Sequence, residues 1–162
     1  MEPRCPQCGK DFVRRSHRQG PIEQFLSLVY VYPFRCQLCT HRFRTLQWGT
    51  RYTRQPVDQR QYERITVRIP VSFSGDQIKG QGVLMDLAMG GGRLETDAKL
   101  TSGALLQVSF QPSEWDPLIT VSTAVVRSVR ASSVGLEFLR IQSADQESLR
   151  QFMLRILSER RA

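Results

Sequence analysis

The second half of the chain alternates between apolar and polar residues with a period of two. In the clearest run every second residue is apolar: Ile65, Val67, Ile69, Val71 and Phe73. Successive side chains of a strand point to opposite faces, so this run predicts a half-buried strand. Pro70 stands on its polar side. That position suits an edge or a bent barrel strand, because proline cannot donate a backbone hydrogen bond.

Similar runs follow, separated by turn residues. The segment SGDQ at 74–77 predicts a turn. Beyond it, apolar positions alternate in four groups: Val83, Met85 and Leu87, which lead into a loop around Asp86; Leu106, Val108 and Phe110; Ile119, Val121, Thr123 and Val125; Val134, Leu136 and Phe138. Five or six short strands, each with one apolar face, predict a closed or nearly closed antiparallel barrel, because closure removes exposed strand edges.

The pattern changes to a helical period near the C-terminus. The segment SADQ at 143–146 resembles a capping box, and apolar residues follow it at spacings of three and four: Leu149, Phe152, Met153, Ile156 and Leu157. We expect this helix to cover one end of the barrel. Packing of two copies through the same face is the alternative.

The first 55 residues follow neither period for long. Their longest apolar run is FLSLVYVYPF at 25–34, well short of the roughly 20 residues that span a bilayer. The chain also opens without the basic start and long apolar stretch of a secretory signal. We therefore expect a soluble, cytoplasmic protein, in which residues 25–34 form a strand or a docking surface, with packing the favoured role.

Two CxxC pairs bracket this run. Cys5 and Cys8 are separated from Cys36 and Cys39 by 27 residues, and the two pairs supply the four soft ligands of a closed tetrahedral zinc site. Gly9 fits such a knuckle, because the residue after the second cysteine often needs a positive φ. The motif resembles a zinc ribbon. A reducing compartment argues against disulfides, and a redox CxxC would need a βαβ pattern that is absent.

With four cysteines available, the metal is expected to be structural, since no coordination position stays open for water. It would fold a segment too small to hold together by core burial alone. His17 and His41 are then surface residues rather than ligands.

The positive charge is concentrated in this cysteine segment. Of the net charge of +8, residues 1–55 hold ten Lys/Arg and three Asp/Glu, a net +7, and residues 56–162 hold thirteen and twelve, a net +1. Four thiolates with one zinc would lower the first figure to +5, still enough to attract polyanions or acidic protein surfaces. A solvated basic face with no specific partner is the alternative.

These patterns divide the chain into three parts. Residues 1–49 form a zinc-ribbon-like domain, the polar residues 50–59 form a linker, and residues 60–162 form the barrel with its C-terminal helix. The apolar fraction of 40% allows a core of moderate size in the second domain.

Two short motifs flank the first barrel strand. RQYER at 60–64 places Arg60 and Arg64 four residues apart, and DLAMGGG at 86–92 places Asp86 before three glycines. Two arginines can clamp phosphates through paired hydrogen bonds while a tight Asp/Gly turn approaches from the neighbouring strand. Either motif alone is ordinary surface chemistry. Together they indicate recognition of an anionic nucleotide. Arg64 and Arg68 form a second such pair, which is less favoured because Arg68 lies within the strand.

Over about residues 58–160 the chain resembles the PilZ family, whose members bind cyclic di-GMP through an RxxxR segment and a [D/N]x[S/A]xxG turn. The resemblance implies a six-stranded barrel and a cyclic di-GMP site. We expect its residues to be Arg60, Arg64, Asp86, Ala88, Gly90, Gly91 and Gly92. Arginine would bind phosphate or stack on guanine, Asp86 would accept guanine N–H bonds, and the glycines would let the main chain approach. Ala88 stands where the family most often has serine, which loses one hydrogen bond.

The favoured hypothesis is a non-enzymatic receptor, in which the barrel binds cyclic di-GMP, the ribbon contacts a protein or nucleic-acid partner, and the linker with Arg60 couples them. The alternative is a nucleic-acid-binding ribbon on a barrel that binds no ligand. An enzyme is disfavoured, because neither histidine lies in the barrel and no base and nucleophile stand at a recognisable spacing.

Overall fold

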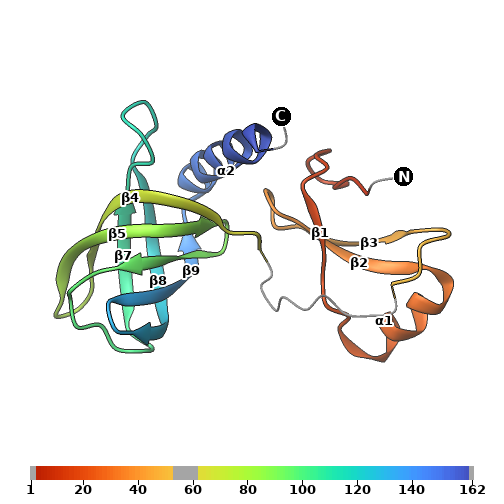
Figure 1. Ribbon diagram of the computed structural model, residues 1–162, viewed down its shortest axis with the longest axis horizontal. Coiled ribbons are helices and arrows are strands. Elements are labelled where there is room, and N and C mark those ends of the chain that lie inside the picture. Colours follow the sequence, from red (N-terminus) through yellow and green to blue (C-terminus); the bar gives the residue numbers. More distant parts are fainter. Residues whose placement is uncertain (1–2, 53–61, 161–162) are drawn as a thin grey trace. The chain divides into compact units, whose positions relative to one another are not determined.

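The computed structural model describes residues 3–52 and 62–160. The chain divides into two compact units, Met1–Glu63 and Arg64–Ala162. In Figure 1 the first unit has a small sheet with a short helix, and the second is a barrel with one long helix. Residues 53–59 of the expected linker lie outside the described residues.

The N-terminal unit is built on a three-stranded antiparallel sheet in the order β1-β2-β3. The strands are β1 (Val13–Arg15), β2 (Val31–Cys36) and β3 (Arg42–Leu46), and α1 (Gly20–Leu26) with the 3-10 turn η1 (Ser27–Val29) connects the first two. Tyr32, Phe34 and Leu38 are its large buried apolar side chains. This core is small, so additional interactions must hold the unit together.

The apolar run at 25–34 divides into two parts. Its second part forms most of β2 and packs, since Tyr32 and Phe34 are almost fully buried. Its first part ends α1 and forms η1, and there Phe25, Leu28 and Val29 are exposed. The expectation that the whole run packs is therefore wrong for the first part, because α1 turns a different face toward the sheet.

The face that α1 buries carries a carboxylate. Glu23 is only 1% exposed, and its two oxygens accept hydrogen bonds from Arg42 Nη1 and Nη2, both at 2.7 Å. Arg44 Nε also donates to it at 3.0 Å, and the backbone N–H of Gln19 at 2.6 Å. The hydrogen bonds from Arg42, followed by those from Gln19 and Arg44, lower the pKa of Glu23 from 4.5 to about 2 against the opposing effect of burial. A charged cluster thus joins α1 to β3.

The C-terminal unit is a closed antiparallel barrel of six strands in the order β4-β5-β6-β9-β8-β7 (Figure 1). The strands are β4 (Ile65–Ser74), β5 (Lys79–Ala88), β6 (Gly91–Glu95), β7 (Leu105–Phe110), β8 (Ile119–Arg130) and β9 (Ser133–Ile141). The turn predicted at 74–77 is present, with Gly75 N–H bonded to the Ile78 carbonyl at 2.7 Å. Pro70 lies just before β4 begins to pair with β7 at Val71, so its missing N–H costs little. The predicted barrel is confirmed.

In two strands, the residues that face the core are not all those that the alternation in the sequence predicts. In β5, Leu84 and Leu87 are fully buried while Val83 and Met85 are partly exposed, because the pairing with β6 shifts between Leu84 and Asp86. A bulge adds one residue to a strand and reverses the facing of those beyond it. In β8, similar shifts bury Ala124 in place of Thr123.

The region predicted as a loop around Asp86 is mostly strand. Asp86 lies within β5, only residues 89–90 form the turn, and Gly91 already begins β6. Alternation could not reveal β6, since two of its five residues are glycines.

The C-terminal helix α2 (Ser143–Glu159) packs against β8 and β4, burying Leu149, Phe152, Met153 and Leu157. The predicted capping box does not form. Gln142 is the N-cap residue, and Asp145 Oδ1 instead accepts the backbone N–H of Thr120 at 3.1 Å, which ties the helix to β8. Neither helix in the described part of the chain combines the length and apolar character needed to cross a bilayer.

The cluster around Glu23 leads to a prediction about the N-terminal unit. Glu23→Gln should destabilise this unit by about 2 kcal/mol, since two arginines lose a buried partner, although the half-exposed Arg44 is partly screened by solvent. Because the folded pKa is depressed, the stabilisation should be full above about pH 4.5 and fall as the pH approaches about 2. Urea unfolding followed by Trp48 fluorescence in a Trp115→Phe background measures both effects.

The matched control is Glu147→Gln, which removes an exposed carboxylate that pairs with Arg150 on the surface of α2. Unfolding of the barrel, followed by Trp115 fluorescence in a Trp48→Phe background, should show a much smaller cost, as for exposed pairs in general. Equal stability of Glu23→Gln and the parent protein at neutral pH would contradict the role given to the cluster.

Candidate functional site

The two motifs meet at one carboxylate. Arg64 lies directly before β4, and its Nη1 donates to Asp86 Oδ1 at 3.0 Å. On the other side, Arg93 of β6 approaches Asp86 Oδ2 with its Nε at 3.3 Å. The side chain of Asp86 is 15% exposed, while those of Arg64 and Arg93 are 29% and 51% exposed. A carboxylate in the barrel wall thus holds two guanidinium groups that solvent can reach.

Strand pairing produces this arrangement. Asp86 in β5 is paired with Thr66 of β4 on one side and with Arg93 of β6 on the other. The register shifts in both pairings beside Met85, so the strand irregularity immediately precedes the carboxylate. Bulges commonly re-aim a side chain in this way. The bulge buries Leu84 and Leu87 and leaves Asp86 between them in reach of both arginines.

Arg93 is a residue of this cluster that the sequence analysis missed. It lies two positions beyond Gly91, the last residue of the [D/N]x[S/A]xxG pattern. A signal was available in the hairpin itself. Once residues 89–90 are taken as a two-residue turn, Ala88 pairs with Gly91 and Asp86 must face Arg93.

Gly91 and Gly92 of the second motif are required by the barrel itself. A Cβ at Gly91 would lie 2.2 Å from the Leu136 carbonyl oxygen of β9, and one at Gly92 would lie 2.7 Å from the carbonyl oxygen of Asp86. Both contacts are with backbone, which cannot move aside cheaply. The Gly90 carbonyl accepts the N–H of Phe138 at 2.9 Å, which anchors the turn to β9. Close strand packing is therefore a reason for these glycines independent of any ligand.

The other expected site residues have different surroundings. Ala88 is 2% exposed and sits in the barrel wall, paired with Gly91. Arg68 is exposed on β4. Arg60 lies outside the described residues. Of the residues expected to bind the nucleotide, the structure brings Arg64 into contact with Asp86 and packs Gly92 against the Asp86 backbone.

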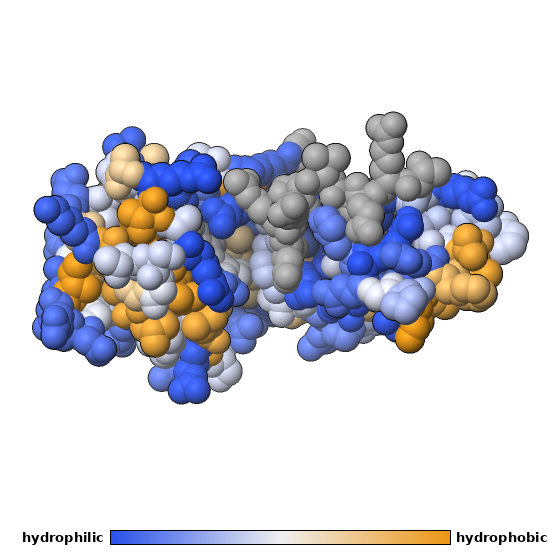
Figure 2. All heavy atoms as spheres, turned by 90° about the horizontal axis from the view of Figure 1, so that it is seen from below, coloured by the Kyte–Doolittle hydropathy of each residue, from blue (hydrophilic) through white to orange (hydrophobic). Residues whose placement is uncertain are grey.

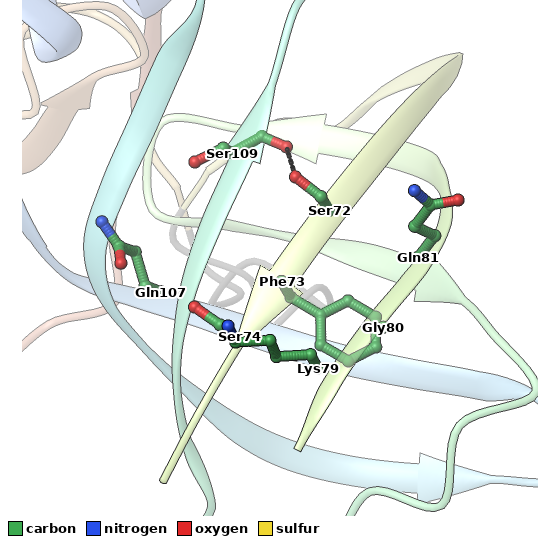
Figure 3. Close-up of a pocket in the computed structure, with 8 residues that line it drawn as sticks. All are labelled: Ser72, Phe73, Ser74, Lys79, Gly80, Gln81, Gln107 and Ser109. Carbon is green, nitrogen blue, oxygen red and sulfur yellow. Dashed lines mark hydrogen bonds between the residues drawn. The ribbon is translucent and has the colours of Figure 1, made fainter. Parts of the chain in front are cut away.

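A depression of about 510 Å³ lies elsewhere on the barrel, over β4, β5 and β7 (Figure 3). Hydroxyl, amide and amino groups surround it: Ser72, Ser74, Lys79, Gln81, Gln107 and Ser109. These residues belong to the end of the barrel where β4 turns into β5, whereas Asp86 is near the opposite end of β5. None of the described residues of the two motifs lines this depression, so it is separate from the cluster of Arg64, Asp86 and Arg93.

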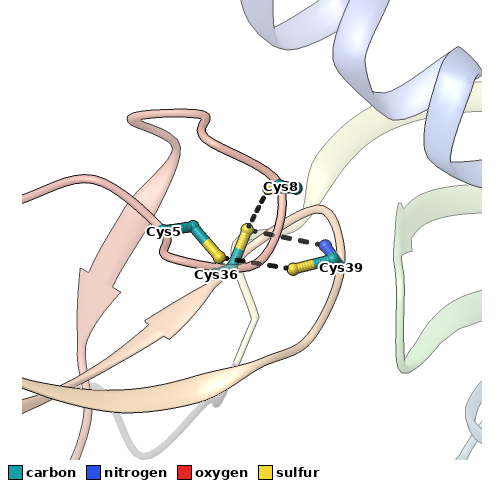
Figure 4. Close-up of side chains that lie close together, drawn as sticks. All are labelled: Cys5, Cys8, Cys36 and Cys39. Atoms are coloured by element: carbon teal, nitrogen blue, oxygen red, sulfur yellow. Dashed lines mark hydrogen bonds between the residues drawn. The ribbon is translucent and has the colours of Figure 1, made fainter.

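The four cysteines form a second cluster, in the N-terminal unit (Figure 4). Their sulfur atoms all lie within 4.8 Å of one another, with Cys5 and Cys39 at 3.4 Å and Cys8 and Cys36 at 3.6 Å. Four sulfurs at about 2.3 Å from a tetrahedral zinc ion are about 3.8 Å apart, so the cluster has the size of such a site. Burial raises the pKa of the Cys36 and Cys39 thiols. A bound divalent cation would counteract this rise, because it stabilises the thiolate form.

Two matching turns shape this cluster. The N–H of Cys5 bonds to the Lys10 carbonyl and that of Cys36 to the His41 carbonyl, both at 2.9 Å. Gly9 has φ +70°, as predicted, and Thr40 has φ +63° at the equivalent place in the second turn. A threonine in the left-handed region is uncommon, so its conformation is imposed by the turn. His41 stacks on Phe43 with ring centroids 6.1 Å apart and does not belong to the cluster.

Comparisons with known proteins bear on the barrel. The family model described as "PilZ domain" matches residues 58–155, more than half of the chain. The chain belongs to the PilZ domain family. The match begins just before the RxxxR motif and extends into α2. The cysteine cluster lies outside it.

Solved structures share the PilZ fold at low identity. The inhibitor of motility MotI/DgrA of Bacillus subtilis is 18% identical, with a TM-score of 0.57 over 82% of this chain and 70% of that one. YcgR from Escherichia coli in complex with c-di-GMP is 18% identical (TM-score 0.54; 92% and 75% covered). The MrkH–c-di-GMP complex of K. pneumonia is 16% identical (TM-score 0.54; 92% and 78% covered). Comparison with curated proteins found no significant match.

Proposed function

We propose that this PilZ protein is a non-enzymatic cytoplasmic receptor for cyclic di-GMP. The observation that carries the proposal is the convergence of Arg64 and Arg93 on Asp86, which joins the two motifs of the family at one place on the barrel. Two proteins of similar fold, YcgR and MrkH, are known in complex with this nucleotide. Their structural similarity at low identity supports the fold alone, and the cluster around Asp86 supports the ligand.

The chemistry of the ligand fits the cluster. Cyclic di-GMP carries two phosphodiester charges and two guanines, so a receptor needs fixed cations, planar groups and hydrogen-bond acceptors. Arg64 and Arg93 can each offer a planar fork to phosphate oxygens or to a guanine edge. Asp86 can accept from the N–H groups of guanine. Arg60, four residues before Arg64, would supply a second cation of the RxxxR motif.

The two ion pairs of Asp86 would not oppose binding of the nucleotide strongly. Arg64 and Arg93 are partly exposed, and ion pairs of this kind contribute about 0–1 kcal/mol each. A doubly charged ligand can replace this interaction with charge-assisted hydrogen bonds to the same guanidinium groups. Asp86 therefore keeps Arg64 at the site and releases it at small cost.

Removing the RxxxR arginines should abolish most of this affinity. In titration calorimetry with cyclic di-GMP, the Arg60→Ala/Arg64→Ala variant should lose at least about 3 kcal/mol, from two charge-assisted contacts of about 1.5–3 kcal/mol each. The control is Lys79→Ala/Arg130→Ala, which also removes two positive charges but at the opposite end of the barrel. It should bind like the parent protein.

Two outcomes would contradict the receptor. One is parental affinity in the arginine variant. The other is no heat of binding for the parent protein together with salt-dependent binding of DNA or RNA, which would favour a nucleic-acid-binding ribbon on a barrel without ligand. The observation that favours nucleic-acid binding as a second candidate function is the net charge of +7 on residues 1–55.

We also propose that Cys5, Cys8, Cys36 and Cys39 bind one structural zinc ion as a ribbon. The spacing of their sulfurs and the paired turns support this. The protein should contain one zinc per chain by elemental analysis. Chelation should unfold the N-terminal unit while the barrel keeps its structure, because the small core of that unit cannot hold it alone.

Single substitutions can distinguish the zinc ligands from nearby residues that do not bind the metal. Cys36→Ser should lose zinc, whereas His41→Ala should keep it, since four sulfurs already complete a tetrahedral site. Retention of zinc by Cys36→Ser with loss by His41→Ala would show that the ligands are assigned wrongly.

Finally, we propose that nucleotide binding is coupled to the ribbon, which serves as an interaction module for a protein or nucleic acid. Arg60 and Arg64 stand at the junction between the ribbon and the barrel in the sequence, so a ligand that binds both would also restrain the junction. Small-angle scattering should change when cyclic di-GMP is added to saturation. The change should be absent in the Arg60→Ala/Arg64→Ala variant, and an unchanged profile of the parent protein would exclude the coupling.

A further inference from the structure

Large apolar side chains gather on the surface of the N-terminal unit. Phe25 is 73% and Trp48 80% exposed, and four aliphatic residues are more than half exposed. These six residues are called the apolar patch: Ile22, Phe25, Leu28, Val29, Leu46 and Trp48. Figure 2 shows apolar side chains gathered beside hydrophilic ones at the end of this unit. Single exposed apolar residues are ordinary, but a group of six in so small a unit is not.

Backbone and ring contacts make the patch one surface. Tyr30 follows η1, and its carbonyl accepts the N–H of Gln47 at 2.8 Å. Its ring lies 5.5 Å from that of Trp48, centroid to centroid, and Val31 pairs with Leu46. On the other side, Ile22, Phe25 and Leu28 recur every third residue along α1 and η1. The patch therefore spans α1, η1 and the end of β3 with the residues after it, and Tyr30 joins its two parts.

The area of the patch needs an explanation. Side chains of this kind expose roughly 100–200 Å² each when they are this accessible, so the patch amounts to several hundred Å². That reaches or exceeds the largest apolar patch of an ordinary monomer, about 300–600 Å², which itself often marks a binding surface. The metal cluster and the Glu23 cluster already hold the unit together without it.

The charges of the unit have almost one sign. Residues 3–52 contain nine Lys/Arg and two Asp/Glu. One of the two carboxylates, Glu23, is 1% exposed and engaged by Arg42 and Arg44. Arg44, itself half exposed, lies on β3 two residues before Leu46 and so on the same face of the strand. One half-exposed cation, Arg44, therefore adjoins the apolar patch in a unit whose net charge is strongly positive.

Aliphatic side chains beside cations of one sign fit one kind of surface best. A protein partner presents both signs of charge, and a second copy of this chain would bring like charges together. Nucleic acid is uniformly anionic, but it takes apolar side chains as single wedges between base steps and does not cover a group of four exposed aliphatic residues. A bilayer with anionic lipids provides both a negative surface and an apolar layer beneath it. We propose that the apolar patch docks this protein on the surface of an anionic membrane.

The test uses the full, zinc-loaded chain and two kinds of vesicle, one of equal parts phosphatidylglycerol and phosphatidylcholine, the other of phosphatidylcholine alone. Co-sedimentation should show binding to the anionic vesicles that weakens with salt, and much weaker binding to the neutral ones. Phe25→Ser/Leu28→Ser should lower the affinity for anionic vesicles at least about tenfold, because two inserted apolar groups are lost. Both residues are exposed, and unchanged zinc content and circular dichroism would confirm that the variant folds.

A matched control removes two equally exposed apolar side chains from the barrel. Trp115 is 92% and Leu118 60% exposed, and Trp115→Ser/Leu118→Ser should bind anionic vesicles like the parent protein. In a Trp115→Phe background, the fluorescence of Trp48 should shift to the blue when anionic vesicles are added, which places the patch itself in the lipid.

Three results would overturn the proposal. The first is no binding to anionic vesicles at low salt. The second is unchanged binding by Phe25→Ser/Leu28→Ser, which would mean attraction by charge alone. The third is equal binding of the parent protein to a labelled DNA duplex with the same loss in Phe25→Ser/Leu28→Ser, which would assign the patch to nucleic acid.

Discussion

The carboxylate of Asp86 accepts guanidinium groups from both neighbouring strands of the barrel, and the candidate site is organised around it. Arg64 reaches it from the start of β4 and Arg93 from β6. This depends on the irregular pairing beside Met85, which lets Leu84 and Leu87 both face the core while Asp86 stays accessible. It also depends on Gly91 and Gly92, since side chains there would collide with backbone and push β6 away. Local packing constraints thus position the charges that a dianionic nucleotide needs.

The N-terminal unit is stabilised differently from the barrel. Its apolar core is small, so two polar clusters supplement it: four sulfurs brought together by two matching turns, and Glu23 held by Arg42 and Arg44. Both clusters lie inside the unit, which leaves the outer face of α1 available. That face carries Phe25 and its apolar neighbours. The exposed patch takes no part in the two clusters that stabilise the unit. Substitutions in the patch can therefore test binding without unfolding the unit.

The sequence predicted the barrel because alternation, turn residues and the two motifs agree with one another. It failed where a local feature changed the period. The bulge beside Met85 reversed the facing of β5, and the glycines of β6 hid that strand. Arg93 was missed because family motifs end at Gly91, although the hairpin register would have placed it opposite Asp86. The capping box failed because the helix begins one residue earlier than predicted, with Gln142 as the N-cap and Ser143 already helical. The gathering of the four cysteines was predictable, since knuckle spacing is a local property.

The central claim is that Arg64, Asp86 and Arg93 form one binding site for cyclic di-GMP. A crystal structure of the protein with the nucleotide bound tests it most directly. It should show the guanidinium group of Arg64 within hydrogen-bond distance of a phosphate or guanine oxygen, with its bond to Asp86 replaced and the Asp86 carboxylate facing a guanine N–H. A nucleotide bound over Ser72 and Gln107, with the bond between Arg64 and Asp86 intact, would contradict the claim.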